Sequence, residues 1–364
     1  MTSSAKNMTP PVRSRERLSH GWRFSRGEPE GGSVLGGCCV EASYDDSQWR
    51  QLEVPHDWGV EEAFDINAPG ETGKLNCQGV GWYRKTIRIE EIDLQGSVHL
   101  EVDGAMSNAA VWVNGVYVGG WCYGYSSFSI DITSCLRSGA DNILAIRLEN
   151  YPDSSRWYTG GGLYRNVWLR KTRPVRVAHH GVHIVTQSAD ENQATVSLSV
   201  ELEDTMYESV SMDLSVCIRK FDTDDANSVV CLLGRESISV SPQGLSVVEL
   251  EACIEKPMLW EPGSPHLYVA ECVLEHQGVV VDRVEVRFGV RTAYFDAKQG
   301  FILNGRPLRL NGVCLHHDLG PLGAAVNVRA MERQLEILLE MGVNAIRCSH
   351  NPPAPEWLDL CDRM

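Results

Sequence analysis

The sequence lacks several features that would assign a protein to a class at once. No apolar run approaches the roughly 20 residues that a bilayer-spanning helix needs, and the amino terminus has no apolar signal-peptide core. Twelve cysteines are present, but no two stand in a C-x-x-C pair, so neither a zinc ribbon nor a dithiol redox motif is supported. We therefore expect a cytoplasmic protein with buried free thiols and no membrane partner.

Positive charge is also scarce. Lys and Arg number 33 against 48 Asp and Glu, which gives a formal net charge of −15. A surface this acidic repels phosphate backbones, so we expect no nucleic-acid partner.

Two motifs of known chemistry are also absent. No G-x-S-x-G nucleophile elbow occurs. The glycines at 160–162 follow no βα turn, so they indicate a tight bend and no phosphate loop.

Strand patterns dominate the first 290 residues. Alternating stretches such as "GWYRKTIRIE" and "NILAIRLEN", with a hairpin signal at Asn114-Gly115, predict an antiparallel jelly-roll sandwich over 1–172, of which 1–17 is a loose arm. A further series of strands, interrupted by an acidic turn at 221–228, predicts an immunoglobulin-like sandwich over 173–292.

The pattern changes over 293–364. A hairpin at Asn304-Gly305 is followed by the strand "VCLHHD", a helix with Asn327 as N-cap and Gly342 after its last turn, the strand "VNAIRCSH" and a second helix. This βαβα order predicts parallel strands and the first two units of a (β/α)₈ TIM barrel. Because such a barrel needs eight units, we expect the chain to be the front part of a longer protein.

Polar residues follow both predicted barrel strands. His316, His317 and Asp318 end the first strand, and Arg347 and His350 end the second, so parallel strands would bring them to one rim. Guanidinium and imidazole groups suit a hydroxyl-rich ligand or a developing negative charge. Two alternatives stay open: a metal site, although adjacent residues of a strand face opposite ways, or polar residues that only cap the barrel.

Two aromatic stretches, 121–128 and 154–164, form another candidate surface, either for stacking on sugars or for packing in a core. The carboxylates of the predicted barrel part lie on outward helix faces, except Asp318, which cannot by itself supply the pair that glycoside hydrolysis uses.

Three stretches resemble glycoside hydrolase family 2, and its β-galactosidase branch most closely: "SSRWYTGGGLYRNVWL", "LNGVCLHHDLGPLGAA" and "MGVNAIRCSHNPPAPEWLDLCDRM". The resemblance implies hydrolysis of terminal non-reducing β-galactosides by a retaining double displacement. It implies substrate contacts at His316, Arg347 and His350, a contact of Arg347 with the nucleophile, and a further sugar contact at Asp153.

The resemblance places both catalytic glutamates on later barrel strands, beyond Met364, so we predict no catalytic residue within these 364 residues. For the full-length enzyme, the resemblance also implies magnesium or sodium as candidate cofactors, with ligands partly outside this chain, and a homo-oligomeric state. The alternatives are a β-glucuronidase or β-mannosidase of the same family, and a non-catalytic carbohydrate-binding or complementing fragment.

Overall fold

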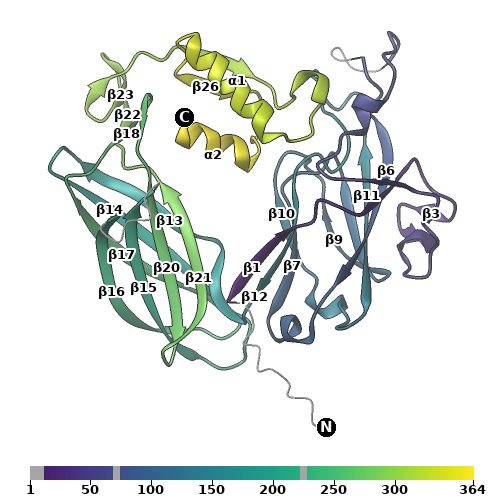
Figure 1. Ribbon diagram of the computed structural model, residues 1–364, viewed down its shortest axis with the longest axis horizontal. Helices are drawn as coiled ribbons and strands as arrows, with labels where there is room; N and C mark the ends of the chain where they lie inside the picture. Colours follow the sequence, from purple (N-terminus) through teal and green to yellow (C-terminus); the bar gives the residue numbers. More distant parts are fainter. Residues whose placement is uncertain (1–11, 69–73, 222–227) are drawn as a thin grey trace.

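The computed structural model describes residues 12–68, 74–221 and 228–364. The chain forms two β-sandwiches and a smaller α/β part that lies across one end of both (Figure 1). This multidomain, mainly β architecture confirms the predicted fold class. The acidic turn expected at 221–228 lies almost entirely outside the described residues.

The first sandwich packs a four-stranded sheet, in the order β1-β12-β7-β10, against a six-stranded sheet, in the order β5-β2-β6-β11-β8-β9. Asn114 and Gly115 join β8 to β9 with φ angles of +52° and +85°, which confirms the predicted hairpin. The strands of this part are β1 (Arg13–Arg17), β2 (Trp22–Arg26), β3 (Gly32–Ser33), β4 (Gly36–Gly37), β5 (Arg50–Leu52), β6 (Gly79–Arg88), β7 (Ser97–Val102), β8 (Ala109–Val113), β9 (Val116–Trp121), β10 (Phe128–Asp131), β11 (Asp141–Asn150) and β12 (Val167–Thr172).

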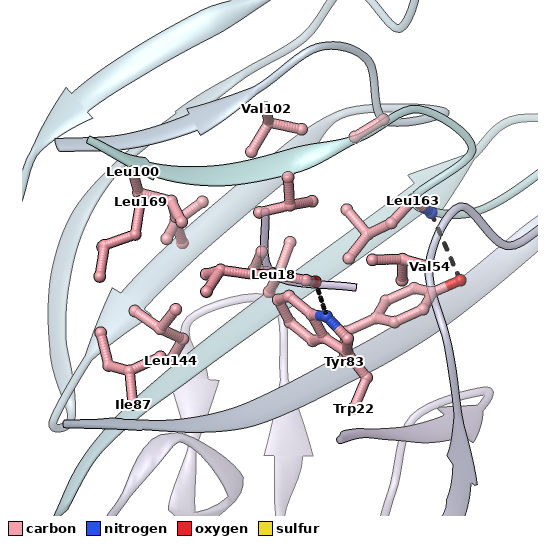
Figure 2. Packing of buried hydrophobic residues seen from close by; sticks show 14 of the residues in the cluster. Leu18, Trp22, Val54, Tyr83, Ile87, Leu100, Val102, Leu144, Leu163 and Leu169 are labelled. Carbon is pink, nitrogen blue, oxygen red and sulfur yellow. Dashed lines mark hydrogen bonds between the residues drawn. The ribbon is translucent and has the colours of Figure 1, made fainter. Parts of the chain in front are cut away.

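Side chains from both sheets of this sandwich meet in one apolar core (Figure 2). Leu100 of β7 and Leu144 of β11 are fully buried, and each such side chain stabilises the fold by roughly 1.5–3 kcal/mol. The one polar atom of the Trp22 ring is satisfied, because its indole nitrogen donates to the Leu18 carbonyl at 2.6 Å. The core therefore buries the large Trp22 ring without leaving its polar atom unpaired.

The prediction of a loose arm is wrong for residues 13–17, which form β1 and pair antiparallel with β12. The strand has no apolar pattern, and charged contacts hold it in place. Arg13 pairs with Asp282 at 2.7 Å, and Arg15 pairs with Glu101 at 2.7 Å. Residues 1–11 of the predicted arm lie outside the described part of the chain.

The second sandwich faces a three-stranded sheet, in the order β13-β14-β17, with a four-stranded sheet, in the order β16-β15-β20-β21. Alternate residues of β14, including Val196 and Leu198, are fully buried between the sheets, as an immunoglobulin-like sandwich requires. The strands are β13 (Val175–Ala189), β14 (Gln193–Asp204), β15 (Val210–Lys220), β16 (Val229–Val240), β17 (Gly244–Glu255), β20 (Tyr268–His276) and β21 (Val279–Phe288), with a short pair of β18 (Trp260–Glu261) and β19 (Ser264–Pro265).

The α/β part begins with a small antiparallel sheet and continues as βαβα. Strands β25 and β26 pair in parallel, with α1 between them in sequence, which confirms the predicted barrel units. The Asn327 side chain accepts a hydrogen bond from the Ala330 amide at 3.0 Å, and Gly342 follows α1 with φ +79°, so both predicted helix signals are confirmed. The elements are β22 (Ala293–Asp296), β23 (Gly300–Leu303), β24 (Arg306–Pro307), β25 (Gly312–Leu315), α1 (Val328–Glu340), β26 (Ala345–Cys348) and α2 (Pro355–Arg363).

The α/β part is fixed to both sandwiches. On the first, Arg165 donates to the carbonyls of Pro352 at 2.8 Å and Pro353 at 3.3 Å. On the second, the Trp260 indole donates to the Asp362 carbonyl at 2.7 Å. The Arg165 contacts hold the segment after β26 against a loop of the first sandwich, and the Trp260 contact holds the end of α2 against the second.

Candidate functional site

The ends of β25 and β26 lie side by side, as the parallel pairing requires. Leu315 is opposite Cys348 in the register, so the residues that follow each strand emerge at the same edge. The His316 ring nitrogen Nδ1 lies 2.9 Å from the Ser349 carbonyl, which joins the two strand ends. His316 and His350, both predicted site residues, are therefore brought together, with ring centroids 6.0 Å apart.

A tryptophan of the first sandwich completes this group. Trp157 stacks on His316 with ring centroids 5.4 Å apart and planes 21° from parallel, and its centroid lies 5.6 Å from that of His350. The indole nitrogen of Trp157 donates to the Tyr125 hydroxyl at 3.0 Å, which fixes the ring. We call Trp157, His316 and His350 the aromatic rim.

The aromatic rim borders an open hollow of about 890 Å³ between the first sandwich and the α/β part. This volume falls within the usual range of small-molecule sites. Two carboxylates, Glu62 and Asp318, and one guanidinium, Arg156, reach its wall. The full lining consists of Val60, Glu62, Phe64, Leu75, Arg156, Trp157, Tyr158, His316, Asp318, Gly320, Pro321 and His350.

Two predicted site residues stand apart from this hollow. Arg347 is exposed within β26, three residues before His350, and donates to the Ser349 hydroxyl at 3.2 Å. Asp153 is exposed in a turn of the first sandwich with φ +55°. Neither residue is among the described side chains that line the hollow.

Met364, beyond which both catalytic glutamates are expected, also lies away from the hollow. It directly follows α2, and its amide donates to the Leu360 carbonyl at 2.9 Å. The side chain is partly buried against the cluster that contains Trp357 and Leu360, and it borders a separate apolar groove on the α/β part. Met364 therefore has a packing role here, and the position of the two glutamates beyond it stays a prediction.

His317 faces the opposite way from His316, as the sequence predicted for neighbouring residues at a strand end. It lies under the first sandwich, with ring centroids 5.0 Å from Tyr125 and 5.8 Å from Tyr164. Its Nε2 donates to the Thr159 carbonyl at 3.0 Å. Burial lowers the pKa of His317 to about 4, so the ring is neutral near pH 7.

Sequence reasoning gave Asp57 no role, although its carboxylate accepts four hydrogen bonds next to the hollow. The carboxylate is buried and accepts hydrogen bonds from loops on both sides of the site. The signal that could have found it is a charged residue placed between the apolar or aromatic residues of "VPHDW". Trp157 lies in the second aromatic stretch of the sequence analysis. Trp157 lines the hollow while Tyr164 is buried, so packing is confirmed for Tyr164 and stacking on a sugar stays a prediction for Trp157.

The described part of the chain offers no candidate metal site. In residues 12–68, 74–221 and 228–364, no three or more His, Cys, Asp or Glu side chains are grouped so that they could hold an ion. The helices of this part are all too short or too polar to cross a bilayer.

Three sequence models that describe successive domains of one family match this chain. The sugar binding domain of glycosyl hydrolases family 2 matches residues 40–173, the model described simply as glycosyl hydrolases family 2 matches 175–291, and the TIM barrel domain of that family matches 296–364. The chain belongs to glycosyl hydrolases family 2. The predicted family is therefore confirmed.

Family 2 proteins of Bacteroides are among its relatives. The chain is 41% identical to the β-galactosidase BoGH2A of Bacteroides ovatus over 99% of its own length and 41% of that protein's. It is 31% identical to a β-glucuronidase of Bacteroides fragilis, covering 86% of this chain and 45% of that protein. The chain thus spans less than half the length of the curated relatives it matches here.

Solved structures agree with this assignment. A family 2 member from Bacteroides cellulosilyticus superimposes with a TM-score of 0.88 at 34% identity, over 96% of this chain and 44% of that one. A β-glucuronidase from Bacteroides uniformis gives a TM-score of 0.84 at 28% identity, over 96% and 41%. The relatives include both galactosidases and glucuronidases, so they establish the family without fixing the sugar.

Proposed function

We propose that this chain supplies the sugar-recognition side of a retaining β-glycosidase that acts on terminal β-galactosides. The observation that carries the proposal is the aromatic rim at the edge of an open hollow. Indole and imidazole faces pack on the C–H face of a hexose, and ring nitrogens hydrogen-bond its hydroxyl groups. His316 and His350 are the proposed hydroxyl contacts.

Arg347 is proposed to act beside this hollow. Its guanidinium is held by the Ser349 hydroxyl at 3.2 Å and remains exposed at the strand end. A planar, permanently charged fork is suited to hold a carboxylate nucleophile in its ionised form. In a retaining mechanism, that carboxylate attacks the anomeric carbon while a carboxylic acid protonates the leaving group, and water then releases the sugar. We infer that both carboxyl groups belong to parts of the protein outside these 364 residues.

The charge of the hollow favours a neutral sugar. Glu62 on its wall is paired with Arg26 at 4.0 Å, whereas the Asp318 carboxylate would repel the carboxylate of a glucuronide. The stretch around Asp318 also resembles the β-galactosidase branch. A β-glucuronide is the second candidate, because the Arg156 guanidinium at the wall could pair with a uronate carboxylate.

Saturation-transfer NMR on the 364-residue chain tests this proposal. We expect signal transfer to methyl β-galactoside and at least fivefold less transfer to methyl β-glucuronide. Trp157→Ala should abolish the transfer, whereas Trp121→Ala, which removes a half-exposed indole away from the hollow, should leave it unchanged. Stronger transfer to the glucuronide would favour the second candidate. Absence of transfer to either sugar, or equal transfer in both variants, would refute the proposed site.

A further inference from the structure

Asp57 is a buried carboxylate held by neutral donors. The residue is 2% exposed, and its Oδ1 accepts hydrogen bonds from the amides of Gly59 and Gly161, both at 2.9 Å. Its Oδ2 accepts from the Tyr158 hydroxyl at 2.7 Å and from the Ala324 amide at 2.8 Å. Four directed donors compensate the cost of burying this charge, and they fix the position of everything that donates to it.

Glycines on two loops leave room for these contacts. A Cβ added to Gly160 would lie 2.5 Å from the Ala324 Cβ, and one added to Gly323 would lie 2.4 Å from Asp57 Oδ2. Both glycines have positive φ, of +69° and +64°, which side-chain-bearing residues rarely adopt. The backbone of both loops therefore closes directly onto the carboxylate.

Both of these loops contribute residues to the lining of the hollow. Tyr158 and Gly161 follow Trp157 in the loop that joins β11 to β12 of the first sandwich. Ala324 belongs to the loop that begins at His316 and passes through Asp318 and Gly320. The Asp57 carboxylate therefore bridges the two loops that line the hollow, because it bonds to Tyr158 of one and to Ala324 of the other.

We propose that Asp57 is a positioning residue that sets the spacing between Trp157 and His316. The part of this proposal that concerns sugar affinity rests on the proposed function above. Other contacts between the two parts survive without Asp57, including the bond from the Val326 amide to the Tyr164 carbonyl at 2.8 Å. Loss of the Asp57 contacts should therefore loosen the hollow locally and leave the two parts docked.

The Tyr158 hydroxyl is well suited to its role in this arrangement. Burial, and then the charge of Asp57, raise the pKa of Tyr158 far above the usual phenol range. The hydroxyl therefore stays protonated and can donate to Asp57 at any pH at which the protein is folded.

The Asp57→Asn variant distinguishes a role of Asp57 in positioning the loops from a general contribution to the stability of the fold. The asparagine oxygen can still accept from Gly59 and Gly161, but its NH₂ group would then face the Ala324 amide, donor against donor. We expect hydrogen–deuterium exchange of peptides covering 319–326 to accelerate at least tenfold, with the urea midpoint of the chain nearly unchanged. Tyr158→Phe, which removes one bond without adding a donor, should produce a smaller acceleration. Asp45→Asn is the matched control, because Asp45 is exposed and its Oδ1 accepts only in a local turn, from the Ser47 amide at 3.0 Å.

Binding then tests the functional consequence. The dissociation constant for methyl β-galactoside should rise at least fivefold in Asp57→Asn and stay constant in Asp45→Asn. Unchanged exchange over 319–326, or an equal acceleration throughout the first sandwich with a lowered midpoint, would overturn the positioning role. If the unaltered chain bound no sugar, the proposed function would fail, while the exchange result would still decide whether Asp57 orders the loop.

Discussion

At the scale of single residues, the contact between the first sandwich and the α/β part depends on the protonation state of His317. Its pKa falls from 6.5 to about 4 because the ring is buried against Tyr125 and Tyr164. Between these two values the unfolded chain binds a proton that the folded chain does not, so stability should fall as the pH drops from 6.5 to 4. Over this pH range, the pKa shift of His317 should lower the free energy of unfolding by about 3 kcal/mol.

His317→Gln should remove this contribution, so the free energy of unfolding should depend less steeply on pH between 4 and 6.5. Urea unfolding at several pH values measures the slope. Part of the slope should persist, since burial also lowers the pKa values of His99 and His179 to about 4. His20→Gln, at an exposed position, should reproduce the slope of the unaltered chain. An unchanged slope in His317→Gln would contradict this account.

Sequence reasoning at this scale succeeded where local geometry decides the outcome. The opposite orientations of His316 and His317 follow from the alternation of side chains at a strand end. Asp57 and Trp157 are different, because their partners lie far away in the chain: Ala324 is the distant partner of Asp57, and His316 stacks on Trp157. No local pattern encodes such a pairing.

At the scale of elements, β1 is held by charge. Arg13 makes a bidentate contact with Asp282, at 2.9 and 2.7 Å, and Asp282 is completely buried. Among the described residues, Arg13→Ala would leave this carboxylate with only the amides of Val177 and Arg283 as donors. Breaking a buried pair on one side costs about 3 kcal/mol, so the urea midpoint should drop markedly.

Arg17→Ala provides the comparison for this prediction, because Arg17 is exposed on the same strand. Its effect on the free energy of unfolding should stay within about 0.5 kcal/mol. If both variants lost the same stability, the strand itself and not the Arg13–Asp282 pair would be responsible. A midpoint unchanged in Arg13→Ala would show that the pair contributes little to the docking of the two sandwiches.

The other elements show the same difference between local sequence signals and contacts with distant residues. The hairpins at Asn114-Gly115 and Asn304-Gly305 were predictable because their positive φ angles suit few residue types. Helix α1 was predictable from Asn327 at its start and Gly342 after its last turn. β1 was not, because a strand of charged residues has no apolar alternation, and its buried partner Asp282 lies more than 260 residues away.

At the scale of the whole molecule, the apolar surface of the α/β part is only partly covered. Helix α1 buries Met331 and Leu335, but its Leu339 remains 44% exposed, and Leu358 of α2 is 53% exposed. These two side chains border the apolar groove of about 280 Å³ that Met364 also lines. Monomeric proteins rarely leave contiguous apolar surface of this kind open to water.

We therefore predict that the 364-residue chain associates with itself in a concentration-dependent way. Its weight-average sedimentation coefficient should rise between about 1 and 50 µM, on the order expected for micromolar contacts. The double variant Leu339→Lys, Leu358→Glu should suppress the rise, because charge at the groove would have to lose its water on contact. Leu35→Lys removes an equally apolar side chain, 86% exposed, from the first sandwich and should not alter the rise. A concentration-independent monomer would refute this prediction, and suppression by Leu35→Lys alone would move the contact to the first sandwich.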